Sequence, residues 1–556
     1  MLHLDKAKEP TFWENVRSNG CFKGFREELL EKWREYGDET EIPTLRYRDF
    51  KLFEETGNRS AYEAPYFKRR TILSVSAILS LIYPDEPKYF EGLLDIIFTI
   101  CDEYTWALPA HLAHINDEKS TRIELFAAGT ALSLVEIYTL LYDRLPDLIR
   151  ERVEKEIDRR ILSPYLATSR YYWEYCTNNW AAVCLSGVAA VFMLLKPEKA
   201  RELIPRFEET MAKYLSGFLD DGVCLEGGMY WDYGFGHFLV YADYIEHFSG
   251  GKINHFKNPK VKEIAFFPQR AYLGAGKAVG FADAYASFSW ETGRMHYLKS
   301  KYPEITLFPE KYSVHTYSRF YSLLRDLMWY NESYENEINE EKVSEYFAPL
   351  SEWYVRKSKH YSLAAKGGNN DEPHNHNDVG SFIFLKNGAE ILADLGKGEY
   401  TRQYFSEERY EILEPSSRSH SVPILDGRHQ LAGKEHKAED FLYKDGTLSF
   451  DFSSAYGLAT GKGVKRSFTF TESTVTLTDC FGYEGEITER LVSCFEPQLV
   501  KDGVIDIKGA RILFDASAWS VSFGKEERTL KRGEYCYFLD FKPKNNEKRF
   551  SCTLEA

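Results

Sequence analysis

The chain has 556 residues, a formal net charge of −15 and a charged content of 28%. This length exceeds one ordinary core, so two or more domains are expected. The acidic balance argues against a nucleic-acid-binding protein, and no apolar run is long enough to cross a bilayer. The nine cysteines are scattered without a CxxC pair, which argues against a disulfide framework and a cysteine zinc cluster.

The N-terminal sequence and the cysteines bear on location. Residues 1–6 lack the basic and apolar blocks of a signal peptide, and the isolated cysteines fit reduced thiols. The sequence as it stands therefore predicts a cytoplasmic protein, or a periplasmic or secreted one if a leader has been removed. Aromatic residues make up 15% of the chain and suit the stacking of sugar rings, although large cores also use them.

Residues 1 to about 330 are predicted to be helical. Apolar residues recur at spacings of three and four in segments joined by short Pro, Asp or Gly breaks, at 67–82, 88–103, 120–143, 147–162, 178–195, 198–217 and 230–248. Helices of this length with short connections favour antiparallel neighbours, as in a bundle or a toroid of helical hairpins.

Beyond an acidic segment at 331–342, which is predicted to be a linker or a surface segment, the hydrophobic period becomes two. Alternation is clear at 448–452, 466–470, 475–478 and 519–523. The predicted fold is therefore multidomain α+β, with an N-terminal (α/α) toroid followed by an antiparallel β-sandwich. The predicted domains are residues 1–335 and 336–556.

The polar loop at 367–380 is rich in side chains that carry chemistry. It contains His374 and His376 and leads into a predicted hairpin with an Asn387-Gly388 turn, whose second strand carries Asp394. On an extended chain both imidazoles point to one side, which suits a shared metal or substrate. A solvated turn is the alternative. His420 adds a further ligand, and two His with a carboxylate are a plausible set for zinc or manganese.

Three segments of the helical half contain candidate binding residues. Asn178 and Asn179 precede Trp180 at the head of a helix, where one Asn is an ordinary N-cap and the other is free to bind an anionic group. After Glu226, Tyr230 and Tyr233 lie on one helix face with His237, an arrangement that is also found in a packed core. The third segment runs from Trp106 to His111, where a structural role is the simpler interpretation.

These segments together resemble the heparinase II/III-like polysaccharide lyases, in that family's order along most of the chain. The resemblance rests on 106–111, 178–180, 226–231, 373–380, 393–396 and 419–427. It implies an (α/α) toroid, an antiparallel β-sandwich, and cleavage of uronic-acid polysaccharides by β-elimination. A departure is Trp180, where some members have His, which leaves open the base for each uronate epimer.

By position, the resemblance implies roles for twelve residues. Tyr230 is the expected catalytic Tyr, with Asn179 and His374 around the uronate carboxylate. His376, Asp394 and His420 are the expected ligands of one divalent ion, with zinc expected and manganese or calcium as alternatives. The expected substrate-binding residues are Trp106, His111, Asn178, Trp180, Glu226 and Tyr233.

The predicted function is a lyase for uronic-acid-containing glycosaminoglycans of the chondroitin, hyaluronan or heparan type. An alginate or oligoalginate lyase of the same mechanism is an alternative. Two others come from different classes: a toroid glycoside hydrolase using Glu226 and Asp232, and an inactive carbohydrate-binding protein. The expected partner is an anionic uronate polysaccharide or oligosaccharide, with no nucleic acid and no membrane; a homo-oligomer is left open.

Overall fold

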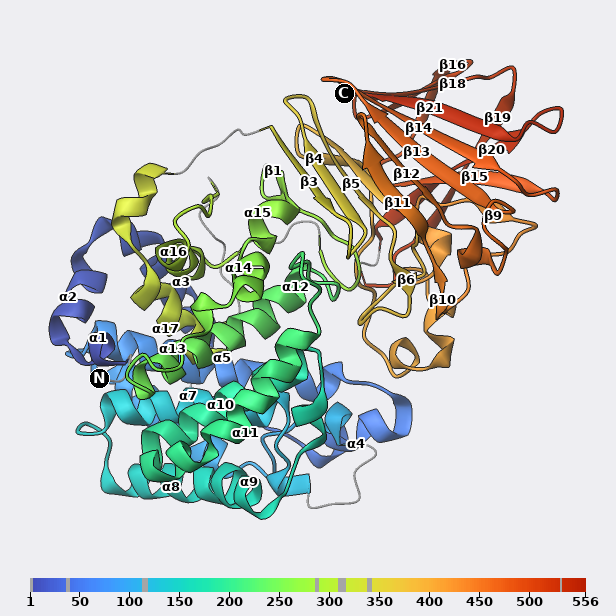
Figure 1. Cartoon of the computed structure of the whole chain (residues 1–556). Coiled ribbons are helices and arrows are strands. Elements are labelled where there is room, and N and C mark those ends of the chain that lie inside the picture. The colour runs from blue at the N-terminus through green and yellow to red at the C-terminus, as the bar shows by residue number, and fades with distance from the viewer. Residues whose placement is uncertain are drawn as a thin grey trace.

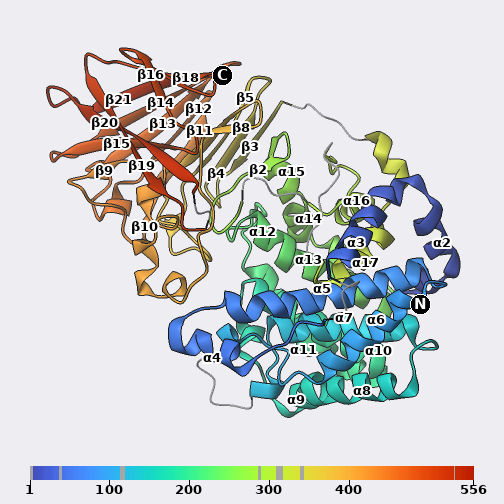
Figure 2. The same ribbon diagram turned by 180° about the vertical axis from the view of Figure 1, so that it is seen from behind.

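A computed structural model describes residues 4–36, 41–112, 119–285, 290–308, 317–337, 343–530 and 533–556. Helices occupy the chain up to residue 337, and the main sheets begin at residue 344 (Figure 1, and from behind in Figure 2). A short hairpin of β1 (Tyr272–Gly274) and β2 (Lys277–Ala278) lies within the helical part. The predicted order, a helical half and then a sheet-rich half, is confirmed.

The helical part is arranged around two helices that are apolar on all sides. Most residues of α7 (Leu125–Leu141) and α10 (Asn179–Leu195) are buried, as expected for helices enclosed by others. α10 contacts α7, α11 (Pro197–Ser216) and α13 (Gly236–Phe248). The amphipathic α11 turns only one face inward, so it belongs to the outer layer.

The start and end of the helical part meet. α17 (Phe320–Trp329) packs against α5 (Ser60–Ile82) and α7, and Lys6 Nζ donates to Met328 O at 2.6 Å. This contact closes the arrangement into a ring. The other helices of eight or more residues in the described ranges are α2 (Pro10–Ser18), α3 (Lys23–Tyr36), α4 (Tyr47–Thr56), α6 (Pro87–Cys101), α8 (Asp147–Ile157) and α16 (Thr292–Lys301).

A five-stranded antiparallel sheet joins the two parts. Its order is β3 (Ser344–Ala348), β4 (Trp353–Lys357), β5 (Tyr361–Lys366), β7 (Phe382–Lys386) and β8 (Ala389–Leu392). Because side chains alternate along a strand, Trp353 packs with the helical core while its neighbour Tyr354 packs with the sandwich core. The sheet therefore belongs to both cores, and the junction between the parts is apolar.

The rest of the C-terminal part is an antiparallel sandwich. An eight-stranded sheet contains β11 (Glu439–Lys444), β12 (Thr447–Asp451), β13 (Val464–Phe470), β14 (Thr474–Phe481), β16 (Gln498–Lys501), β17 (Val504–Ile507), β18 (Ala510–Phe514) and β21 (Arg549–Glu555). A four-stranded sheet contains β9 (Ile424–Leu425), β15 (Ile487–Ser493), β19 (Trp519–Glu527) and β20 (Tyr535–Pro543). The short pair of β6 (Asn369–Asn370) and β10 (Gly433–Lys437) flanks the polar loop.

The sequence located these elements well, with local differences. The β7–β8 hairpin turns through Asn387 and Gly388, both with positive φ, as the Asn-Gly pair predicts. Asp394 lies two residues beyond the end of β8 and not on the strand. In the predicted linker, a 3₁₀ helix covers Glu332–Glu337, and residues 338–342 lie outside the described ranges.

Candidate active site and metal centre

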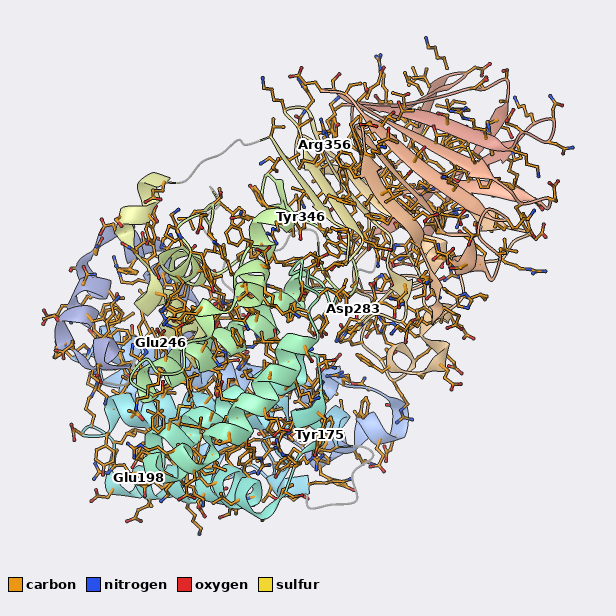
Figure 3. All side chains as sticks on the ribbon, in the orientation of Figure 1. Tyr175, Glu198, Glu246, Asp283, Tyr346 and Arg356 are labelled. Carbon is orange, nitrogen blue, oxygen red and sulfur yellow. The ribbon has the colours of Figure 1, made fainter. Side chains whose placement is uncertain are left out.

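The candidate site is centred on Asp283, which the sequence analysis did not identify. Figure 3 shows it where the helical and sheet-rich parts meet. Its carboxylate is fully buried. It accepts hydrogen bonds from His374 Nδ1 (2.8 Å), His376 Nε2 (3.1 Å), Tyr400 OH (3.0 Å), Arg409 Nη2 (3.2 Å) and Tyr404 OH.

These partners fix the charge of Asp283 and the tautomers of both imidazoles. Burial favours a higher pKa for this carboxyl, but hydrogen bonds from His374 and His376 and the charge of Arg409 hold its pKa well below the usual range. An ionised carboxylate only accepts hydrogen bonds. The protons therefore lie on Nδ1 of His374 and on Nε2 of His376, which leaves His374 Nε2 and His376 Nδ1 for other partners.

Two glycines allow neighbouring segments to reach the Asp283 loop. A Cβ on Gly227, whose φ is +92°, would lie 2.9 Å from Phe281 O. A Cβ on Gly396, whose φ is +66°, would lie 2.0 Å from Ala284 O. Neither approach is open to a residue with a side chain. The segment leading to Tyr230 and the segment leading to Tyr400 are thus both held against the loop that carries Asp283.

Tyr230 is held between the two parts of the protein. Its ring stacks on His374 with centroids 3.9 Å apart, and its hydroxyl lies 2.9 Å from the Tyr400 hydroxyl. Tyr230 ends the short α12 (Gly228–Tyr230) at the start of a π-helical turn, a feature common at functional sites. Burial and then Asp283 raise the pKa of Tyr230, while the hydrogen bond with Tyr400 lowers it by less.

The other end of the site contains groups that can bind a carboxylate. Asn179 Nδ2 donates to Glu226 Oε2 at 2.7 Å, and His374 Nε2 lies 3.8 Å from the same oxygen. Burial raises the pKa of Glu226, partly offset by His374 and Asn179. Asn178 is the N-cap of α10, so the two adjacent amides have different roles. The structure thus brings together Tyr230, His374, Asn179 and Glu226 as predicted.

The prediction of an extended backbone at His374 is wrong. Its φ is +58°, in the left-handed region that few residues other than glycine adopt. Such conformations cost about 1–3 kcal/mol and cluster at functional sites. Both imidazoles nevertheless reach one carboxylate, because this turn rotates His374 toward Asp283 on the helical side.

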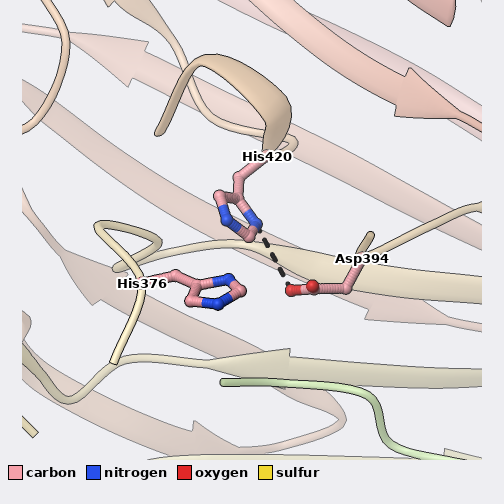
Figure 4. Close-up of side chains that lie close together, drawn as sticks. All are labelled: His376, Asp394 and His420. Atoms are coloured by element: carbon pink, nitrogen blue, oxygen red, sulfur yellow. Dashed lines mark ion pairs between the residues drawn. The ribbon is translucent and has the colours of Figure 1, made fainter. Parts of the chain in front are cut away.

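His376, Asp394 and His420 form a separate buried cluster whose ligand atoms all lie within 4.8 Å of one another (Figure 4). His420 Nε2 faces the carbonyl oxygen of Glu414 at 3.0 Å, so this nitrogen carries the proton. His376 Nδ1, His420 Nδ1 and Asp394 Oδ2 have no hydrogen-bond partner among the described residues. Buried polar atoms are normally paired, so three facing one another indicate a missing partner.

A divalent ion fits this donor set. Asp394 Oδ2 lies 3.3 Å from His420 Nδ1, which matches the edge of roughly 3.3 Å expected for a tetrahedron with ligands about 2 Å from zinc. The other ring nitrogen of His376, Nε2, donates a hydrogen bond to Asp283. Metal-binding imidazoles commonly donate to a carboxylate in this way. The predicted ligand triad is thus assembled, and its composition suits zinc.

The other predicted substrate-binding residues fall into two groups. His111 Nδ1 lies 2.6 Å from Glu124 Oε2, and its ring is 5.0 Å from Trp180, which follows Asn179. This aromatic wall continues the site along the helical part. Trp106 is instead buried in the core, where its Nε1 donates to Ile100 O. Tyr233 lies under the Arg319 guanidinium, 4.0 Å from its ring centroid.

Glu226 and Asp232, the carboxylate pair of the glycoside hydrolase alternative, do not face a common partner. Glu226 faces Asn179, whereas Asp232 is paired with Arg294.

The residues that the sequence analysis missed are Asp283, Tyr400, Tyr404 and Arg409. Tyr400, Tyr404 and Arg409 follow the predicted metal ligand Asp394, and the available signal for them was Gly396 and Gly398, which allow close backbone approach. A lone Asp at 283 has no local signal.

Comparisons with known proteins were made at the level of sequence and of structure. No family model matches the sequence, and no curated protein matches it. Heparan sulfate lyase HepC (mutant) from Pedobacter heparinus aligns with a TM-score of 0.59 at 12% identity, covering 100% of this chain and 92% of that one. A crystal structure of heparinase III gives 0.61 at 13% identity, with 100% and 92% covered.

A third similar structure is that of a chondroitin lyase. The chondroitin AC lyase of Streptomyces coelicolor A3, in complex with chondroitin sulphate, aligns with a TM-score of 0.57 at 10% identity, covering 98% of this chain and 82% of that one. Since identities are this low, the likeness concerns the fold. The chain has the heparinase-like polysaccharide lyase fold, a helical toroid followed by a β-sandwich.

Proposed function

We propose that this protein is a polysaccharide lyase that cleaves uronic-acid-containing glycosaminoglycans by β-elimination. The observation that carries the proposal is the position of Tyr230. Its hydroxyl meets Tyr400 at 2.9 Å while its ring stacks on His374, next to Asn179 and Glu226. A proton-transferring group and a carboxylate-binding group thus adjoin, as β-elimination next to a uronate carboxylate requires. The similar structures include a heparan sulfate lyase and a chondroitin AC lyase.

The carboxylate end binds the uronate. The proton at C5 is weakly acidic, and its removal moves charge onto the adjacent carboxylate. Asn179 meets this charge through its second Nδ2 hydrogen. His374, which donates Nδ1–H to Asp283, meets the charge in its imidazolium form, in which Nε2 also carries a proton. Burial raises the pKa of Glu226, and in its protonated form this group donates to the substrate. One donor aimed at developing charge is worth about 10²–10³ in rate.

The hydroxyl end transfers the protons. One member of the Tyr230–Tyr400 pair, as a phenolate, takes the C5 proton. The C5–H electrons form the C4–C5 double bond as the C4–O4 bond breaks, and the other phenol protonates O4. The pair ends as it began, with one proton fewer than two neutral phenols, and no water is consumed. Positioned proton transfer contributes roughly 10²–10⁴.

A zinc ion held by His376, Asp394 and His420 would supply a structural cross-link. It would tie the loop that carries His374 to the segment that carries Tyr400, since His376 and Asp394 are close in sequence to these two residues. Asp283 accepts hydrogen bonds from both His374 and Tyr400 and so sets their relative position.

The test is absorbance in the near ultraviolet, where the C4–C5 double bond of a lyase product absorbs. Heparan sulfate, chondroitin, hyaluronan and alginate would be incubated separately with the full chain, and a gain with one or more of the three glycosaminoglycans is the expected result. A gain with alginate alone would replace the proposed substrate class. New reducing ends without an absorbance gain would indicate hydrolysis and reject the mechanism.

A further inference from the structure

Lys397 lies beside the tyrosine pair and forms no ion pair with the residues that the structure describes. Its ammonium is 4.5 Å from the centroid of the Tyr400 ring and 5.5 Å from that of Tyr285. The side chain is half-buried, and it forms no hydrogen bond or ion pair with any residue that the structure describes. A partly desolvated ammonium without an acceptor is costly, so such a position calls for a ligand.

The charges around Lys397 already have partners of their own. The groups that act on it are Asp283, Arg59 and Glu63. Asp283 accepts hydrogen bonds from five side chains, and Arg59 is paired with Glu63 at 2.6 Å. Burial is the largest influence on the Lys397 pKa and lowers it. Because Asp283, Arg59 and Glu63 are engaged with other groups, the Lys397 side chain is open to an anion that enters the site, and such an anion would favour the ammonium form.

The backbone holds Lys397 in place. Its amide donates to Ala284 O at 3.3 Å, and the amide of Gly398 donates to the Tyr404 hydroxyl at 3.2 Å. On the other side, the amide of Gly396 donates to Asp394 Oδ1 at 2.8 Å. Lys397 is thus attached to the metal-ligand segment and to the Asp283 loop at once, which reduces the entropy lost when it binds a ligand.

The chain after Tyr400 encloses this corner of the site. Arg402 donates to the backbone carbonyls of Phe53 and Glu54 at the end of α4, and its Cβ would lie 2.8 Å from a Cβ on Gly57. Phe405 packs under the guanidinium of Arg59, 5.8 Å from the ring centroid. Because this contact joins the two parts of the protein beside Tyr400, an anion near Lys397 is less screened than on open surface.

We propose that Lys397 binds a second anionic group of the substrate, distinct from the carboxylate held near His374 and Asn179. The two positions are separated by the Tyr230 ring, which stacks on His374 while its hydroxyl points to Tyr400. The ligand is a sulfate or carboxylate on the sugar next to the cleaved bond. The inference rests on the proposed lyase function for its placement, and it explains how a chain of net charge −15 attracts a polyanion at this point.

The experiment compares Lys397→Met, which keeps length and removes charge, with Lys397→Arg, which keeps charge. Lys88→Met is the matched control, because Lys88 lies 5.1 Å from the Tyr89 ring at the start of α6, beside the end of α5 that is opposite Arg59. Each is assayed for kcat and KM on a heparan sulfate oligosaccharide and an unsulfated oligosaccharide of the same backbone and length. Calorimetry measures their binding to Tyr230→Phe and to Tyr230→Phe with Lys397→Met.

Lys397→Met is expected to raise KM and Kd about ten- to a hundred-fold, the value of one charge-assisted hydrogen bond, with little change in kcat and with rescue by Lys397→Arg. A loss limited to the sulfated ligand identifies a sulfate, and an equal loss with both identifies a carboxylate. If Lys397→Met behaves like Lys88→Met, the inference is overturned while the lyase function stands. Lys397-dependent binding without cleavage overturns the function alone, and absence of any binding overturns both.

Discussion

Two clusters of His and Asp side chains share one residue, His376, yet their chemistry differs. The Asp283 carboxylate is surrounded by five donors from the protein itself. In the neighbouring triad of His376, Asp394 and His420, the facing ligand atoms have no hydrogen-bond partner among the described residues. The first cluster is complete within the chain, and the second presents facing ligand atoms that a divalent cation would fit.

Proton positions account for the difference between the two clusters. Because Asp283 is ionised, it accepts a hydrogen bond from each of two imidazoles, and the unprotonated nitrogen of His376 faces the triad. The same carboxylate therefore orients both imidazoles, one toward Glu226 and the other toward the triad. Changes that act on one cluster test whether this link holds.

The largest effect is expected from Tyr230→Phe, which removes the proton-transferring hydroxyl and keeps the ring. Turnover should fall by roughly 10³ or more, since acid and base transfer both pass through the tyrosine pair. Circular dichroism and the thermal midpoint should be unchanged. Tyr47→Phe, at a residue that is 79% exposed, is the control. Near-normal turnover in Tyr230→Phe would move the role to Tyr233 or reject it.

His374→Ala should lose activity mainly through kcat, by roughly 10²–10³, with a smaller change in KM. Stabilisation of the uronate carboxylate grows as charge moves onto it in the transition state. Steady-state kinetics on the cleaved polymer measure the split, and the exposed His360→Ala is the control. A variant with normal kcat would show that the loop has only a structural role.

The isolated helical part, residues 1–335, should be inactive, because His374 and Tyr400 are missing from it.

Asp283→Asn tests the complete cluster. An amide cannot accept from every donor around it, and it no longer favours the proton on His374 Nδ1. We expect a loss of about 10² in kcat, together with weaker metal retention through His376, which in comparable sites costs roughly 10–100-fold in affinity. Asp445→Asn, in an exposed turn, is the control. A variant that lost activity and kept its metal affinity would show that the clusters are independent.

The pH dependence tests the tyrosine pair. Burial is the largest cause of the raised pKa of both Tyr230 and Tyr400, so the pair retains its protons at neutral pH. The active form lacks one proton, and its fraction rises as pH rises toward the pKa. kcat/KM should therefore increase about tenfold per pH unit above neutrality, measured over a range where the protein stays folded. A flat profile from pH 7 upward would assign the base elsewhere.

The sequence predicted what depends on short spacing. The β7–β8 hairpin followed from Asn387-Gly388, and His376, Asp394 and His420 were found because metal-ligating residue types stand out even when dispersed. Asp283 could not be found in this way, since it lies 91 residues from His374 in a stretch without periodicity. The positive φ of His374 was not predicted either, because positive φ is uncommon at any residue with a side chain and is imposed here by the loop.

The smallest effect on turnover is expected from removal of the metal, since the proposed ion binds behind the site and touches no reacting atom. Protein purified without chelator should hold one equivalent of zinc by elemental analysis, and a chelator should lower its thermal midpoint by about a few degrees, because a ligand at 100 times its Kd adds roughly 2.7 kcal/mol of stability. His420→Ala should lower the midpoint similarly and make it insensitive to chelator. His436→Ala, at an imidazole that bonds Ser454 O outside the triad, should retain the metal and its chelator response. Because the triad fixes His376 and the Asp394 segment, turnover should fall only as far as His374 and Tyr400 lose their positions. A protein that contains no stoichiometric metal, or a His420→Ala variant that still responds to chelator, would show that the unpaired atoms of the second cluster have some other partner.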